Sequence, residues 1–344
     1  MSRDPRPVAL VTNTVPDYRR EPFRLLGEAE GIDLIAWQDS GQRAAVRRLA
    51  RGSHRAVIAG LGGRLALPAA YAIARRRRIP FVLWASLWEH PATLVHRLSE
   101  RPANALYRRA DAVVTYGPHV TRYVAERRGG TGSVFEAPQS VDVEHFARLV
   151  TTSERDEARG RAGASPDHPL VLFVGRLEHE KGADLLARAF ERAGVDATLA
   201  FSGSGPLESR LPNTLGRVGR DRLPALYAAA DMLVLPSVRT ATFTEPWGLV
   251  VNEAMLQGTP VITSDAVGAA AGGLVRHEGN GLIVPQADTG ALATAIRRLC
   301  EDAGLRHRLG DSARTDAAAY TPQAWVAGMR AALRAAGAGR EEHG

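Results

Sequence analysis

Short apolar, β-branched runs alternate with amphipathic, helix-like stretches along most of this chain, and no other feature constrains its fold as much. In the first part of the 344-residue sequence the expected strands are residues 8–12, 32–37, 56–59, 81–84, 112–116 and 134–137. The alternation breaks at 138–142 and across a polar stretch at 151–169, and the later expected strands are 170–174, 197–202, 232–235, 260–263 and 282–284. Strands that alternate with helices form parallel α/β sheets, so the pattern predicts two doubly wound, Rossmann-like domains in tandem.

The break in the alternation sets the expected domain boundaries. A chain of 344 residues is longer than one hydrophobic core usually serves. We expect an N-terminal domain at 1–141, a C-terminal domain at 142–321, and a last segment at 322–344. The helix of that segment, expected at 323–335, is expected to pack back on the N-terminal domain, and the tail from residue 337 is expected to be disordered.

Charge and hydropathy limit the classes of partner. The formal net charge of +7 would attract nucleic acid, anionic lipid or a phosphorylated ligand. The arginines are scattered, however, and the densest cluster, 75–78, ends an expected helix, where cations are favourable, so we expect a solvated face and no nucleic-acid partner. No apolar run reaches the ~20 residues that cross a bilayer. The expected location is the cytoplasm, and peripheral contact with the inner face of the membrane stays open.

A single lysine marks the first expected ligand site. Lys181 is the only lysine among 44 Lys and Arg residues, and it begins an expected helix shortly after the strand at 170–174 and the pair Gly175-Arg176. Ligands bind beyond the carboxyl ends of parallel strands. We therefore expect Arg176 and Lys181 to bind a diphosphate together with the helix N-terminus. Gly203 follows the next strand, in a turn that would let the backbone approach the same ligand.

The segment 244–260 carries a second group of candidates. Pro246 suits the first turn of a helix and Gly258 its end. The free backbone N–H groups of that helix, which form an anion site, would then be those of Gly248, Leu249 and Val250. Glu245 precedes the helix and Glu253 follows about two turns later on the same side. Carboxylates beside an anion site fit a ligand that carries both hydroxyls and phosphates, as a nucleotide sugar does.

These motifs resemble those of a known family. Glu245 and Glu253, with seven residues between them, resemble the signature of retaining glycosyltransferases of family 4, which belong to glycosyl transferases group 1. Further matching segments follow in the family's order, at 174–182, 203–206, 216–218, 230–237, 257–261 and 279–285. The resemblance covers residues 134–300 well and the first domain only by its alternation. It implies the GT-B fold, in which two Rossmann-like domains face one another across a cleft.

The resemblance also implies a reaction and its residues. A UDP- or GDP-sugar would donate its sugar to a hydroxyl acceptor with retention of configuration. Arg176 and Lys181 would hold the donor diphosphate and stabilise it as it leaves, so neither a metal nor another cofactor is expected. Glu245 would contact the transferred sugar and Glu253 the ribose. The other donor-binding residues would be Gly175, Gly203, Val218 near the base, Gly248, Leu249 and Val250.

The acceptor side is less defined. The first domain is expected to bind a sugar, a lipid-linked molecule or a small molecule, with Tyr18, Arg19 and Trp88 lining the site and His90 taking part in catalysis. The glycine pair that many relatives have after the first strand is absent from the loop at 13–20. The stretch between residues 205 and 216 is short, which predicts that a helix near the base site is missing.

Two other functions remain open. One is a different GT-B enzyme, a phosphorylase or an epimerase. The other is a basic protein without catalytic activity that binds nucleic acid or a membrane surface. Only the pI of about 10.1 supports the basic binder, whereas the ordered motifs account for Lys181 and both glutamates together.

Overall fold

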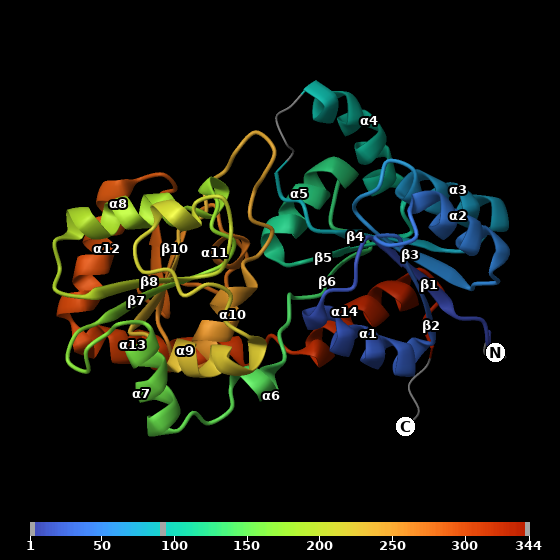
Figure 1. Ribbon diagram of the computed structural model, residues 1–344. Coiled ribbons are helices and arrows are strands. Elements are labelled where there is room, and N and C mark those ends of the chain that lie inside the picture. The colour runs from blue at the N-terminus through green and yellow to red at the C-terminus, as the bar shows by residue number, and fades with distance from the viewer. Residues whose placement is uncertain (1–3, 90–93, 341–344) are drawn as a thin grey trace. The chain divides into compact units, whose positions relative to one another are not determined.

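Two parallel sheets organise the chain, one in each of two units (Figure 1). The computed structural model describes residues 4–89 and 94–340. The first unit consists of residues 1–140 and 321–344, and the second consists of residues 141–320. All eleven strands expected from the sequence are present, six in one sheet and five in the other.

The first unit has a six-stranded sheet in the order β2-β1-β3-β4-β5-β6. The strands are β1 (Val8–Thr12), β2 (Ile32–Ala36), β3 (Ala56–Gly60), β4 (Phe81–Ala85), β5 (Ala112–Thr115) and β6 (Val134–Glu136). Strand β1 pairs in parallel with β2 on one side and with β3 on the other. The strand order therefore reverses at β1, and doubly wound sheets bind ligands beside such a reversal.

Helices cover both faces of this sheet, which is why its central strands are continuous apolar runs. One face is covered by α2 (Gln42–Arg51), α3 (Ala66–Arg77), α4 (Leu94–Arg109) and α5 (Pro118–Arg128). The other face is covered by α1 (Asp17–Glu30) and α14 (Pro322–Ala335), the helix at the end of the chain. Trp325 of α14 is fully buried, with its ring 5.7 Å from that of Phe23 and 5.6 Å from that of Trp84.

A buried carboxylate fixes the end of the chain to the first unit. Glu30, at the end of α1, accepts hydrogen bonds from Arg55 at 2.8 Å, from Arg330 of α14 at 2.9 Å and from the backbone N–H of Arg340 at 2.9 Å. Ala338 is also buried. Within the segment expected to form a disordered tail, the N–H of Arg340 thus contacts this carboxylate, and the carbonyl of Ala338 accepts a hydrogen bond from Arg55 at 3.0 Å.

The second unit has a five-stranded sheet in the order β11-β10-β9-β7-β8. Its strands are β7 (Leu170–Val174), β8 (Thr198–Ser202), β9 (Met232–Leu235), β10 (Val261–Ser264) and β11 (Gly281–Val284). Helices α8 (Ala183–Ala193) and α12 (Thr289–Glu301) pack together on one face (Figure 1). The other larger helices are α7 (Thr152–Arg161), α9 (Leu223–Ala229), α10 (Leu249–Leu256) and α13 (Ala303–Ala317).

Helices α7 and α1 differ from the sequence-based expectation. Part of the polar stretch at 151–169 forms α7, which begins with a capping box between Thr151 and Glu154. Helix α1 begins at Asp17, so Tyr18 and Arg19 lie on its first turn and not in a loop. No helix among the described residues is long and apolar enough to cross a membrane.

Candidate functional site

A pocket of about 420 Å³ lies beyond the carboxyl ends of β7 and β8 in the second unit. It is lined by Val174, Gly175, Arg176, Ser202, Gly203, Ser204, Arg217, Val218 and Leu223. The structure thus brings together four of the residues that the sequence analysis assigned to a nucleotide-sugar donor, namely Gly175, Arg176, Gly203 and Val218. We call this space the donor-side pocket.

Gly203 allows the two turns of this pocket to touch. Its φ is +146°, and a Cβ atom built on it would lie 1.8 Å from the carbonyl oxygen of Gly175. Its N–H donates to the carbonyl of Gly216 at 2.8 Å. A side chain at this position would therefore separate the turns that follow β7 and β8.

Arg176 is held beside the pocket by acidic side chains of its own loop. Its guanidinium forms ion pairs with Glu178 and, at 2.6 Å, with Glu180, and its side chain is 54% exposed. An exposed guanidinium with partners on a short loop can exchange them for a phosphate at little cost.

Lys181 and Glu245 form an ion pair in the second unit. Lys181 follows β7 in a short 3-10 helix, η1 (His179–Lys181), and its ammonium donates a hydrogen bond to Glu245. The hydroxyl of Ser237, just after β9, donates to the same carboxylate at 3.2 Å. Glu245 is only 5% exposed, and the ammonium lies 4.9 Å from the ring centre of Phe243. The lysine and the first glutamate of the sequence motif are therefore in direct contact.

Helix α10 begins later than the sequence pattern predicts. Pro246 predicts a helix from that residue, but the helix starts at Leu249 with Gly248 as N-cap at a φ of +92°. Residues before it are extended instead: the carbonyls of Glu245 and Trp247 accept hydrogen bonds from Gly268 at 3.1 Å and Ala269 at 2.8 Å.

The first turn of α10 nevertheless offers free donors. The N-cap residue, Gly248, has no side chain that could cap this helix. Because the first N–H groups of a helix have no partner within it, those of Leu249 and Val250 are available to an anion.

Glu253 lies one turn further along α10 against a buried tyrosine. The hydroxyl of Tyr227, on α9, donates to Glu253 at 2.6 Å. Although part of the side chain of Glu253 remains open to solvent, loss of hydration raises its pKa to about 7, and the Tyr227 hydrogen bond and the charge of Arg220 oppose that rise. The carboxylate is therefore easily protonated near neutral pH and is a good acceptor for hydroxyl groups when ionised.

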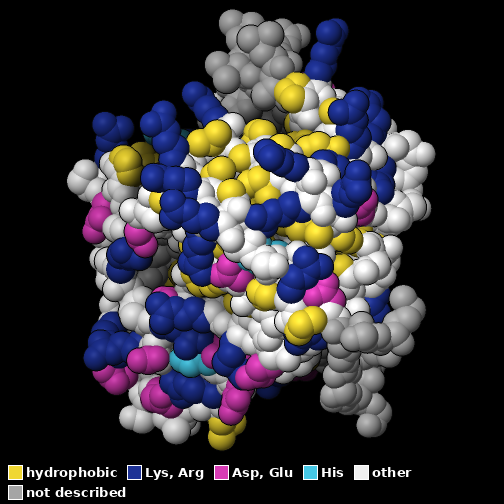
Figure 2. All heavy atoms as spheres, turned by 90° about the vertical axis from the view of Figure 1, so that its right-hand side faces the viewer, with side chains coloured by type: hydrophobic (Ala, Val, Ile, Leu, Met, Phe, Trp, Pro, Cys, Tyr) yellow, Lys and Arg dark blue, Asp and Glu magenta, His cyan; other side chains and the backbone are white. Residues whose placement is uncertain are grey.

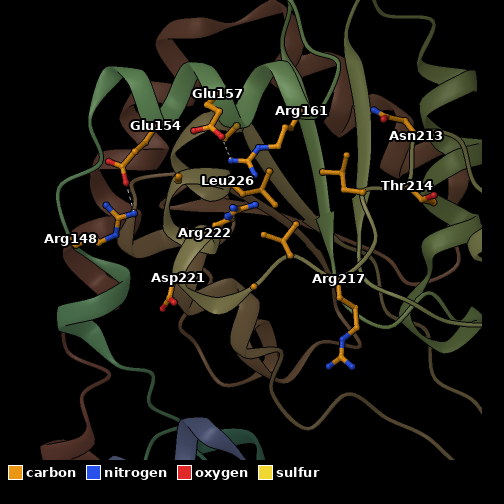
Figure 3. Close-up of a pocket in the computed structure, with 15 residues that line it drawn as sticks. Arg148, Glu154, Glu157, Arg161, Asn213, Thr214, Arg217, Asp221, Arg222 and Leu226 are labelled. Carbon is orange, nitrogen blue, oxygen red and sulfur yellow. Dashed lines mark hydrogen bonds and ion pairs between the residues drawn. The ribbon is translucent and has the colours of Figure 1, made fainter.

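A larger pocket of about 570 Å³ adjoins the donor-side pocket, with Arg217 and Val218 lining both. Figure 3 shows the ion pairs Arg148–Glu154 and Glu157–Arg161 along α7, with Arg222 and Leu226 near the centre and Arg217 pointing away from them. Between β8 and residue 219 the described chain forms only one short 3-10 helix, η2 (Glu208–Arg210). The described part of this short stretch thus contains no α-helix, and residues 213–215 and 217–219 line the open space.

Two of the four acceptor-side candidates share a pocket. Tyr18 and Arg19 line a pocket of about 150 Å³ in the first unit, beyond the ends of β1, β3 and β4. Trp88 does not line it, and its ring packs edge-on against His119 at 5.4 Å. His90 lies outside the described residues.

Three residues that contact the predicted site residues were not themselves predicted from the sequence: Tyr227, Phe243 and Ser237. Tyr227 and Phe243 gave no signal, because a single aromatic residue in an apolar or loop segment is usually part of the core. Ser237 lay within one of the matching motifs, at 230–237, which was the only available indication. Across residues 4–89 and 94–340, no group of three or more His, Cys, Asp or Glu side chains is arranged to hold a metal ion.

Some of the arginines that make the surface basic have partners within the fold. Arg75 pairs with Asp111 at 2.8 Å, and Arg77 donates to the carbonyls of Leu49, Ala50 and Gly52 at the end of α2. Figure 2 shows Arg side chains spread over one face of the molecule among hydrophobic and acidic groups and not gathered in one continuous patch.

Comparison with known proteins agrees with the fold and with the motifs. Residues 154–316 match the family model of glycosyl transferases, group 1. An uncharacterised glycosyltransferase of Methanocaldococcus jannaschii is 33% identical over 215 residues, which are 56% of this chain and 53% of that protein. A D-inositol 3-phosphate glycosyltransferase of Xylanimonas cellulosilytica is 34% identical over 198 residues, which are 52% of this chain and 45% of that protein. The chain thus spans about half the length of the curated relatives it matches.

The fold extends the likeness to nearly the whole chain. The crystal structure of Anabaena HepE in complex with UDP and glucose matches with a TM-score of 0.74 at 19% identity, covering 96% of this chain and 99% of that chain. A likeness at this identity concerns the fold alone. The fold is GT-B, with two Rossmann-like domains built on parallel sheets. The family match covers residues 154–316, which lie within the second unit.

Proposed function

We propose that this protein is a retaining glycosyltransferase that moves a sugar from a nucleotide-diphosphate donor to a hydroxyl acceptor. The observation that carries the proposal is the donor-side pocket, which gathers Gly175, Arg176, Gly203 and Val218 within the segment that matches group 1 glycosyl transferases. The Lys181–Glu245 pair adds the cation and the carboxylate that the reaction requires.

Each part of the donor has a proposed partner. The base lies near Val218, and the ribose hydroxyls donate to Glu253. The diphosphate is bound by Arg176, Lys181 and the first turn of α10, where the N–H groups of Leu249 and Val250 have no partner in the helix. Glu245 accepts hydrogen bonds from the transferred sugar once the diphosphate attracts the ammonium of Lys181. UDP is the preferred nucleotide, because a protein of the same fold holds UDP and glucose.

The chemical step exchanges one bond for another. The bond between the anomeric carbon and the diphosphate oxygen breaks, and a bond from that carbon to the acceptor oxygen forms on the same face. The proton of the acceptor hydroxyl passes to the departing diphosphate. Arg176 and Lys181 stabilise the negative charge that develops on the diphosphate, so the proposed reaction needs no metal ion.

The test measures donor binding and turnover in EDTA. Thermal unfolding is followed with UDP, GDP, ADP and TDP, since a ligand specific to the folded protein raises the melting temperature. We expect a shift with UDP that is lost in Lys181→Ala and kept in Arg188→Ala. Arg188 is a matched control, because it is an exposed cation on α8 whose partner is Asp184.

Turnover separates the possible reactions. Transfer from a UDP-sugar to an acceptor should give a product whose anomeric configuration, read by NMR, is that of the donor. Inversion, release of sugar 1-phosphate with inorganic phosphate, or UDP binding that is the same in Lys181→Ala and wild type would each contradict the proposal.

A further inference from the structure

Arg19 is a buried cation that forms no ion pair with any described residue. Its side chain is 2% exposed, and its Nη2 donates to the Gln139 side chain at 2.6 Å. Its Nη1 is also buried, yet it has no hydrogen-bond partner among the described residues. The residues that line the pocket beside Arg19 include no aspartate or glutamate.

Aromatic rings fix the position of this guanidinium. Its carbon lies 4.7 Å from the ring centre of Trp84, 5.1 Å from that of Tyr18, 5.5 Å from that of Trp325 and 5.6 Å from that of Tyr116. Cation–π contacts offset part of the lost hydration, but they leave the N–H groups of Nη1 unsatisfied. Because buried guanidinium groups ordinarily pair with a carboxylate or a phosphate, the missing counter-charge points to a ligand.

The position in the fold is that of a ligand site. The pocket is lined by Thr12 at the end of β1, by Gly60 at the end of β3 and by Trp84 near the end of β4. It lies beside the strand reversal of the first sheet, where doubly wound folds bind ligands.

The N-terminus of α1 adds to the positive potential. Pro16 and Tyr18, at the start of this 14-residue helix, line the same pocket, and the side chain of the N-cap residue Pro16 makes no capping hydrogen bond. The first-turn N–H groups and the buried guanidinium therefore favour the same kind of group, an anion.

The pocket has room for an oxyanion. Its volume of about 150 Å³ is enough for one phosphate, sulfate or carboxylate group.

We infer that the pocket around Arg19 binds one oxyanion group of the acceptor, so that the preferred acceptors are anionic, such as sugar phosphates or sugar carboxylates. That the anion belongs to the acceptor rests on the proposed function. The anion site itself rests only on the geometry of Arg19 and is tested separately.

The first experiment uses inorganic phosphate, sulfate and acetate at constant ionic strength with the full chain. Saturating UDP is present so that the added anions cannot bind on the donor side. The titration is repeated without UDP in Lys181→Ala, because this variant lacks the lysine that is proposed to bind the donor diphosphate. Because Trp84 and Trp325 contact Arg19, tryptophan fluorescence should change in a saturable way. We expect at least a tenfold loss of affinity in Arg19→Gln and no loss in Arg20→Gln. Arg20 is the matched control, because it is the next residue on α1 and its side chain is 74% exposed.

A readout without substitutions covers the case in which Arg19→Gln does not fold. Hydrogen exchange of the wild-type protein should show slower exchange at residues 13–20 when phosphate is added in the presence of UDP. No response to any of the three anions, protection only in the second unit, or equal affinities of Arg19→Gln and wild type would overturn the anion site.

The second experiment tests the link to the acceptor. With a UDP-sugar donor, kcat/KM for a phosphorylated or carboxylated acceptor should exceed that for its uncharged counterpart at least tenfold. The preference should disappear in Arg19→Gln and persist in Arg20→Gln. If the anion site binds phosphate but wild type shows no such preference, the site is not an acceptor site, and the acceptor assignment is wrong. If the wild-type protein does not bind UDP, the proposed function is contradicted. The anion site is then tested by the phosphate titration of Lys181→Ala, which is made without UDP.

Discussion

The hydroxyl of Tyr227 lies 2.6 Å from Oε2 of Glu253 and donates a hydrogen bond to it. Tyr227 is fully buried, so the inner side of the carboxylate faces protein and only its outer side can meet a ligand. Burial raises the pKa of Glu253 to about 7. It also raises the pKa of Tyr227 well above its usual value, with the neighbouring carboxylate as a second cause, so the phenol stays a donor throughout the neutral range.

The first prediction is that Glu253 makes stability depend on pH. Between its ordinary pKa of 4.5 and about 7 the folded protein keeps a proton on Glu253 that the unfolded chain has lost. The free energy of unfolding should therefore fall as pH rises through this window, because ionisation is less favourable in the folded state. Glu253→Gln should be more stable than wild type at pH 8, by at most about 3 kcal/mol, and the difference should shrink towards pH 5.

Urea unfolding at pH 5, 6, 7 and 8 measures this difference. Glu191→Gln, at an exposed position on α8, is the control and should show no such dependence. An offset between Glu253→Gln and wild type that is the same at all four values would mean that the pKa of Glu253 is not raised.

The second prediction concerns the coupling between Lys181 and Glu245. The side chain of Lys181 is 15% exposed and that of Glu245 is 7% exposed, so removal of either charge leaves the other in a poorly hydrated place. Lys181→Met should cost roughly 3–5 kcal/mol of stability, and the double variant with Glu245→Gln should recover part of that loss. A double-mutant cycle by urea unfolding measures the coupling, and additive effects of the two substitutions would show that the pair contributes none.

The sequence predicted the sheets because each strand has a local signal. The run at 170–174, for example, is apolar at every position and is buried on both faces. The start of α10 was not predictable in the same way. Pro246 is compatible with a helix, but the preceding backbone pairs with residues 267–269, about twenty positions later in the chain. Tertiary hydrogen bonds of this kind override the local preference.

The site residues also divide into those with a local signal in the sequence and those that depend on tertiary contacts. Lys181 was identifiable because it is the only lysine, and Glu245 and Glu253 because their spacing is a motif. Arg19 was a candidate by position, but its burial was not predictable, since the rings around it come from residues 84, 116 and 325. An arginine on the first turn of a helix ordinarily faces solvent, whereas this one is buried among rings from β4, from residue 116 and from α14.

The third prediction is that Glu30 anchors the end of the chain. Its side chain is fully buried with Arg55 and Arg330, whose side chains are 4% and 16% exposed. Glu30→Ala should lower the free energy of unfolding by roughly 3–5 kcal/mol, because it leaves two poorly hydrated cations without a partner. Glu28→Ala, on the same helix, should cost less than about 1 kcal/mol, because Glu28 is 61% exposed and pairs with the exposed Arg24. Equal effects of the two substitutions in urea unfolding would contradict the anchoring role.

The last prediction tests whether the contact between the two turns of the donor-side pocket is needed for donor binding. In Gly203→Ala the new methyl group would lie 1.8 Å from the carbonyl oxygen of Gly175, at a φ that side chains rarely adopt. The turns after β7 and β8 must then move apart, which should cost about 1–3 kcal/mol of stability for the backbone strain alone and weaken UDP binding at least tenfold. Gly219→Ala is the matched control, because a Cβ atom there meets nothing within 4 Å. Thermal unfolding and calorimetric titration with UDP measure both effects. If Gly203→Ala bound UDP as tightly as Gly219→Ala, the close approach of these turns would not define the donor site.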